Sequence, residues 1–166
     1  LDLPVFNGKY SASCYIDGTI SALSNMSQNR GQSLSKLLKD ATAVFMHRPF
    51  HKMPLNAFSI SYLYALANGD KDDNQELQNL IKEADLGSEE IERELKEKPD
   101  LKSFLQTDIN KDLFPQTSKA LKALNKIESF KDKVLSKLKL GNELTKEMGN
   151  IYSGSIFAWL AAGIED

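Results

Sequence analysis

Cysteine and histidine are scarce in this chain, and their scarcity excludes several kinds of site. The 166 residues include one cysteine, Cys14, and two histidines, His47 and His51. A single cysteine cannot form an internal disulfide, and it excludes zinc sites built from several cysteines. The two histidines have Pro49 between them and no evident third ligand. We therefore expect no metal site.

A strong net charge and long apolar runs are also missing. The 21 basic and 23 acidic residues give a formal net charge of -2, so no overall basic field favours nucleic acid. The longest apolar runs, such as residues 156–164, are far shorter than the roughly 20 residues of a membrane-spanning helix. The chain starts at Leu1-Asp2-Leu3-Pro4, and from these residues we expect no signal or transit peptide. We expect a cytoplasmic protein and a chain that is part of a longer polypeptide.

Apolar residues at helical spacing predict helices over residues 11–28, 53–67 and 153–164. Residues 42–46 form a compact apolar run, which fits a buried strand of a parallel sheet. Ser153 is the expected N-cap of the last helix. The expected buried face of that helix consists of Ile156, Phe157, Leu160, Ala161 and Ile164. The sequence therefore predicts a helix-rich α/β domain.

The middle of the chain divides into two segments of opposite charge. Residues 70–100 contain twelve acidic and five basic side chains, whereas residues 101–149 contain ten lysines and six acids. Opposite net charge favours packing of the two segments on each other. Two solvated helical faces without specific pairing explain the same pattern equally well.

The densest group of polar side chains that could take part in catalysis or binding lies at residues 47–53, between the predicted strand and the second helix. A neutral imidazole at a strand end, such as His47, can act as a general base or as a hydrogen-bond donor to an oxyanion. Lys52, near a helix start, can bind an anionic group such as a phosphate. A histidine at a strand end also has common structural roles, so the residues by themselves leave both interpretations open.

Three segments share their pattern with one enzyme family. Residues 47–53 read His-Arg-Pro-Phe-His-Lys-Met, residues 7–16 contain Asn-Gly-Lys-Tyr-Ser and Cys-Tyr-Ile, and residues 149–155 read Gly-Asn-Ile-Tyr-Ser-Gly-Ser. In this order and at compatible spacing they resemble three segments of hydroxymethylglutaryl-CoA synthases. Those segments read His-x-Pro-(Tyr/Phe)-x-Lys-(Met/Leu), Asp-Gly-Lys-Leu-Ser with Cys-Tyr-Leu, and Gly-Asn-x-Tyr-Thr-(Gly/Ser)-Ser.

The resemblance implies an α/β fold, namely part of the C-terminal half of a thiolase-like fold that is helix-rich with an incomplete sheet. Residues 1–166 would form one domain fragment, with residues 68–145 as its variable helical region. The family's nucleophilic cysteine and catalytic glutamate belong to the N-terminal half and have no counterpart here. Cys14 falls in a helical segment instead, where we expect a buried structural thiol. The chain alone would then be inactive.

The same resemblance assigns site residues and partners. The catalytic residues would be His47 and Asn150, and the substrate-binding residues would be Lys52, Pro49, Tyr152 and Ser153. The substrates implied are acetyl-CoA and acetoacetyl-CoA, with no cofactor besides the CoA thioesters, and the full-length parent would be a homodimer. Asn56 stands where the family often has a second lysine, which leaves a carrier-protein-bound acyl group open as the substrate. A 3-oxoacyl-acyl-carrier-protein synthase III-like enzyme and a non-catalytic helical binding fragment are the alternatives.

Overall fold

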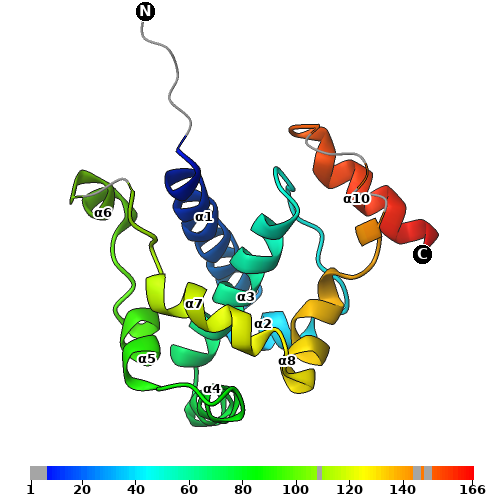
Figure 1. Ribbon diagram of the computed structural model, residues 1–166. Coiled ribbons are helices and arrows are strands. Elements are labelled where there is room, and N and C mark those ends of the chain that lie inside the picture. Colours follow the sequence, from blue (N-terminus) through cyan, green and yellow to red (C-terminus); the bar gives the residue numbers. More distant parts are fainter. Residues whose placement is uncertain (1–6, 108–109, 144–146, 148–150) are drawn as a thin grey trace, which may run out of the picture.

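The computed structural model describes residues 7–107, 110–143, 147 and 151–166, and in this part of the chain it is made of helices and loops (Figure 1). No helix among the described residues has the length and apolar character that crossing a membrane requires. The elements are, in chain order, α1 (Gly8–Asn29), α2 (Leu34–Asp40), α3 (Lys52–Ala67), α4 (Lys71–Glu83), α5 (Glu89–Lys96), α6 (Leu101–Thr107), α7 (Pro115–Leu124), α8 (Glu128–Lys133), the 3-10 helix η1 (Leu135–Leu138) and α10 (Gly154–Glu165).

Helix α3 forms the centre of the molecule. It is apolar around most of its circumference, which is typical of a helix that is enclosed by others. Helices α1, α2, α4, α5 and α7 and the 3-10 helix η1 all contact it. Its fully buried side chains include Ala57, Phe58, Ile60, Leu63 and Leu66. The predicted buried helix over residues 53–67 is therefore confirmed.

Helix α1 covers one side of α3 and confirms the helix predicted over residues 11–28. It begins at Gly8 because the Asn7 side chain accepts a hydrogen bond of 2.9 Å from the Tyr10 backbone N–H. It buries Ile16 and Ile20 in the core. The chain leaves the helix through Gly31, whose φ of +63° favours glycine.

The strand predicted over residues 42–46 is wrong, because these residues form an irregular segment between α2 and α3. A strand needs an extended neighbour to share its backbone hydrogen bonds. Here the Val44 N–H donates instead to the carbonyl of Lys137 in η1, at 2.7 Å. The described residues contain no strand, so the expected incomplete sheet is not observed. The apolar character of the segment has another cause, since Val44, Phe45 and Met46 pack against the core.

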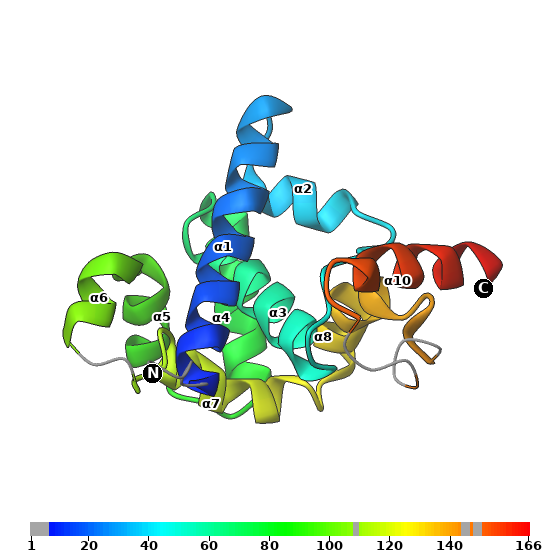
Figure 2. The same ribbon diagram turned by 90° about the horizontal axis from the view of Figure 1, so that it is seen from above.

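Helix α10 lies at the edge of the molecule (Figures 1 and 2). Its bounds agree closely with the predicted residues 153–164, but a different face of the helix is buried. Its anchor is Trp159, which is fully buried, donates from Nε1 to the Leu140 carbonyl at 2.6 Å and meets the Phe45 ring edge-on. This large side chain decides which face of the helix turns inward. Phe157 and Ile164, predicted to be buried, are consequently 71% and 77% exposed.

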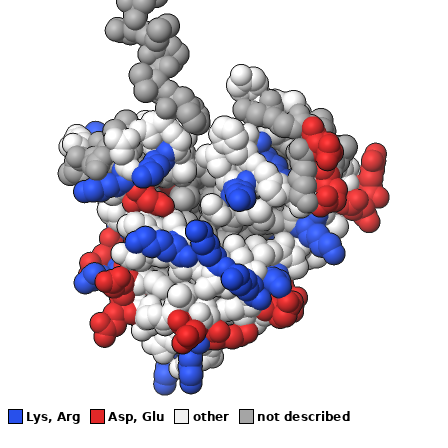
Figure 3. Space-filling view, in the orientation of Figure 1, with Lys and Arg blue, Asp and Glu red and all other residues white. Residues whose placement is uncertain are grey.

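The acidic and basic segments do contact each other, through a few specific interactions. Helix α5 lies against α7, where the Glu94 carboxylate accepts hydrogen bonds of 3.0 and 2.7 Å from the backbone N–H groups of Gln116 and Thr117. A carboxylate at a helix N-terminus interacts favourably with the helix dipole. The lysines of α7, Lys119 and Lys122, are exposed. Basic side chains form a band across the face of the molecule that Figure 3 shows. The acidic and basic segments therefore pack on each other at specific contacts, while other charged side chains of the same segments face solvent.

Candidate active site

His47 lies where the irregular segment approaches both α1 and α10. Its side chain is half-buried, and its Nδ1 is 2.9 Å from the Oγ of Ser155 in α10. Its backbone carbonyl accepts a hydrogen bond from the Tyr15 hydroxyl of α1. Both the backbone and the ring of His47 are thus fixed by residues that are distant in the sequence.

A cavity of about 460 Å³ adjoins His47, between α1 and the irregular segment. Helix α1 contributes Cys14, Tyr15, Gly18, Thr19, Ala22 and Leu23, and the segment contributes Val44, Phe45, Met46 and His47. Most of these side chains are apolar. The cavity can therefore take an apolar group, with the imidazole near enough to bind a polar atom of the same ligand.

Arg48 connects the His47 segment to the C-terminal part of the fold. It is only 4% exposed, and its guanidinium lies 4.5 Å from the centroid of the Trp159 ring. Its terminal nitrogen contacts Asn142 Oδ1 at 2.5 Å and His51 Nδ1 at 2.6 Å. Burial lowers the pKa of Arg48. Arg48 could not be singled out from the sequence, because it stands at the variable position x of the motif His-x-Pro.

Lys52 is the first residue of α3, and its side chain is exposed. A lysine at the N-terminus of a sixteen-residue helix is well placed for an anion, since the helix dipole adds to its charge. Pro54 lies in the same first turn, where the backbone N–H that proline lacks would have no helical partner. Pro54 therefore fits the helix start without displacing Lys52. Pro49, just before it, is half-buried.

In the motif at residues 149–155, the residue that contacts His47 was not predicted to be functional. Tyr152 is 78% exposed with a φ of +53°, and Ser153 is exposed and forms no capping hydrogen bond, contrary to its expected role. Ser155 is buried and contacts His47. The small residues at this helix start were the only sequence signal for such a close approach. Asn150 lies outside the described residues, so its convergence with His47 stays a prediction.

Cys14 lies on α1 and lines the same cavity as His47. Its side chain is partly rather than fully buried, which corrects the expectation of a buried thiol. Its interaction with the Tyr10 hydroxyl raises the pKa of Tyr10. The position in a helix agrees with the predicted structural role, although the thiol faces a cavity.

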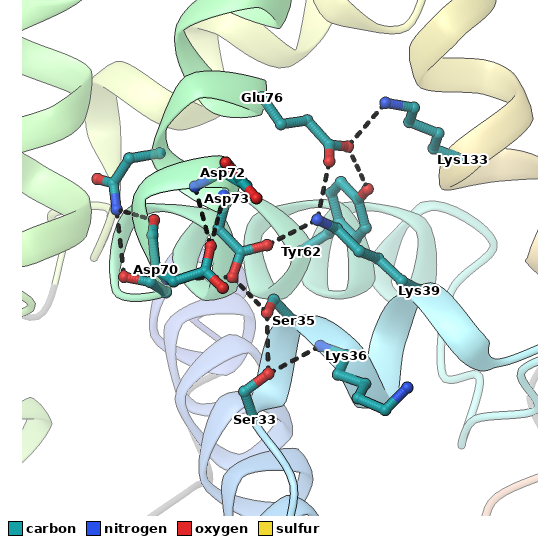
Figure 4. A network of polar contacts seen from close by, with 12 residues as sticks. Ser33, Ser35, Lys36, Lys39, Tyr62, Asp70, Asp72, Asp73, Glu76 and Lys133 are labelled. Carbon is teal, nitrogen blue, oxygen red and sulfur yellow. Dashed lines mark hydrogen bonds and ion pairs between the residues drawn. The ribbon is translucent and has the colours of Figure 1, made fainter.

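A second polar network joins α2, α3, α4 and α8 (Figure 4). The Lys39 ammonium lies 2.6 Å from an Asp73 oxygen and 2.9 Å from a Glu76 oxygen. Glu76 also accepts a hydrogen bond from Tyr62 at 2.6 Å and pairs with Lys133 at 2.9 Å. Burial opposes ionisation of Glu76, but the hydrogen bonds from Tyr62, Lys39 and Lys133 outweigh it and lower its pKa to about 2.

Opposite charges balance within this network, so its role is to hold four helices together. Sequence periodicity did not reveal it, although Asp70 and Asp73 at the start of α4 carry the pattern of a capping box. In the part of the chain that the structure describes, no three His, Cys, Asp or Glu side chains are grouped so that they could hold a metal ion.

Comparison with known proteins identifies one family. The family model described as "Hydroxymethylglutaryl-coenzyme A synthase C terminal" matches residues 2–166. No curated protein and no solved structure matches significantly.

Proposed function

The chain belongs to the hydroxymethylglutaryl-coenzyme A synthase C-terminal family, and on that premise we propose that it forms part of an acyltransferase that makes hydroxymethylglutaryl-CoA. In this reaction an enzyme-bound acetyl group condenses with acetoacetyl-CoA. The family match over residues 2–166 is the observation that carries the proposal. We expect the nucleophilic cysteine and the catalytic glutamate in another part of the parent protein.

His47 and Asn150 are the proposed catalytic residues of this chain, and His47 is the one that the described residues include. The acetyl-enzyme carbanion attacks the ketone carbonyl of the acetoacetyl group, and negative charge develops on that oxygen. An imidazole N–H aimed at the oxygen stabilises this charge. The position of His47 beside a mostly apolar cavity supports the role, because the imidazole can reach a polar atom of a ligand whose apolar part lies in that cavity.

Lys52 is the proposed contact for the CoA moiety. Its exposure at the start of α3 supports this role, since the phosphates of CoA are anionic and outside any acyl pocket. Pro49, Tyr152 and Ser153 are proposed to line the substrate channel. Asn150 is proposed to hold the thioester oxygen through its amide N–H.

The test is steady-state kinetics of the parent synthase with acetyl-CoA and acetoacetyl-CoA. We expect His47→Ala to lower kcat by about 10²–10³, the loss typical of a missing oxyanion donor. His51→Ala is the matched control and should change kcat little. If His51→Ala were the damaging substitution, the assignment of the histidines would be reversed. Condensation with a carrier-bound acetoacetyl group, but not with acetoacetyl-CoA, would instead favour the carrier-protein variant of the reaction.

The 166-residue chain by itself should not condense the two substrates, because covalent catalysis needs a cysteine nucleophile that Cys14 does not provide. The measurement is product formation by the purified chain, with Cys14→Ala as the control. Turnover that Cys14→Ala abolishes would contradict the structural role of this thiol.

A further inference from the structure

Ser155 is a buried polar residue whose hydroxyl forms its hydrogen bonds with a distant part of the chain. It is the second residue of α10 and only 4% exposed. Its Oγ lies 3.0 Å from the backbone nitrogen of Arg48 and 2.9 Å from Nδ1 of His47. These partners precede it by 107 and 108 positions.

The donor and acceptor roles of these groups follow from their chemistry. A backbone N–H only donates, so the Ser155 oxygen accepts from Arg48. A hydroxyl can accept a second hydrogen bond, but the proton of this buried hydroxyl also needs an acceptor, and Nδ1 of His47 lies at hydrogen-bond distance from it. A nitrogen that accepts a hydrogen bond carries no proton itself. When Ser155 donates to Nδ1, the neutral imidazole carries its proton on Nε2.

We propose that Ser155 is a positioning residue that holds neutral His47 as the Nε2–H tautomer and thereby presents Nε2–H to the substrate. This inference rests on the proposed function of His47 as an oxyanion donor. The ring has two nitrogens, and only a protonated one can donate to the developing charge. With Nδ1 bound to Ser155, the whole donor capacity of the neutral ring lies on Nε2.

The surroundings hold Ser155 itself in place. Its backbone N–H donates to the Tyr152 carbonyl at 3.0 Å, which closes the first turn of α10. One turn further along, the buried Trp159 fixes the helix through its bond to Leu140 and its stacking with Arg48. The helix start that carries Ser155 therefore cannot move away from His47 without moving Trp159 out of the core.

The direct test is the tautomer of His47, read from ¹⁵N chemical shifts of the histidine-labelled chain at a pH where the imidazole is neutral. A spectrum of the His51→Gln variant assigns the signals. We expect a lone pair on Nδ1 and a proton on Nε2. A proton on Nδ1 in the unsubstituted protein overturns the proposal, whatever the variants do.

Two variants separate positioning from packing. Ser155→Ala removes the donor, and we expect the tautomer preference of His47 to be lost, whereas Ser155→Thr should restore it. Ser13→Ala is the matched control, because Ser13 is also buried and its Oγ accepts a backbone N–H, that of Leu113 at 3.2 Å. Ser13→Ala should leave the histidine spectrum unchanged. An unchanged spectrum in Ser155→Ala contradicts the proposal.

Kinetics of the parent synthase then connect the tautomer to catalysis. We expect Ser155→Ala to lower kcat about tenfold with little change in KM, and Ser155→Thr to recover most of the loss. The two proposals fail in different ways. If His47→Ala leaves kcat unchanged, the proposed function of His47 fails while the spectrum still reports the tautomer. If the spectrum shows Nδ1–H, the role of Ser155 fails while that of His47 stands.

Discussion

Glu76 offers a stability prediction whose size follows from the structure. Its side chain is 16% exposed and bonded to Tyr62, Lys39 and Lys133. A pKa of about 2 instead of 4.5 corresponds to about 3 kcal/mol of folding free energy at neutral pH. The side chains of Lys39 and Lys133 are 35% and 46% exposed, so solvent screening reduces this to about 1–2 kcal/mol. Glu76→Gln should destabilise the protein by that amount at pH 7.

The pH dependence of this loss identifies its cause. The pKa of Glu76 is lower in the folded than in the unfolded state, so its contribution is complete above the unfolded pKa of about 4.5 and is lost as the pH falls toward about 2. The difference between wild type and Glu76→Gln should therefore be constant from pH 6 to 7 and should fall by more than half at pH 3.

The assay is urea unfolding followed by circular dichroism at pH 7, 6, 4 and 3. Glu97→Gln is the control, because Glu97 is exposed at the C-cap of α5, where removing a negative charge should cost little. A loss for Glu76→Gln that is equal at pH 7 and pH 3 refutes the electrostatic explanation. Packing or the Tyr62 hydrogen bond would then account for the effect.

Three further predictions concern packing and the backbone. Trp159→Ala should cost about 3–5 kcal/mol, since the side chain is fully buried, whereas Phe157→Ala, at an exposed position on the same helix, should cost less than about 0.5 kcal/mol by urea unfolding. Gly18→Ala should raise Tm and stabilise by about 0.4–1 kcal/mol, because it lies within α1 and a Cβ there meets nothing within 4 Å. Gly141→Ala should lower Tm, because φ is +66° and the Cβ would lie 2.6 Å from the Gly163 nitrogen.

The sequence by itself determined the two helices that carry many apolar residues. The predictions over residues 11–28 and 53–67 were confirmed as α1 and α3. Helical spacing identifies the buried face of α1, whereas apolar residues around most of the circumference of α3 identify a helix enclosed by others. The family was also readable, since the three motifs that resembled it belong to a chain matched over residues 2–166.

Tertiary structure decided the features that depend on a partner. An apolar run such as residues 42–46 becomes a strand only if another extended segment shares its hydrogen bonds, and the neighbour here is the 3-10 helix η1. The buried face of α10 depends on where the Trp159 side chain is buried. The spacing of apolar residues along the sequence does not show this. The pairing of Ser155 with His47 joins residues 108 positions apart. A local pattern specifies local structure, whereas a contact across that distance exists only once the whole chain has packed.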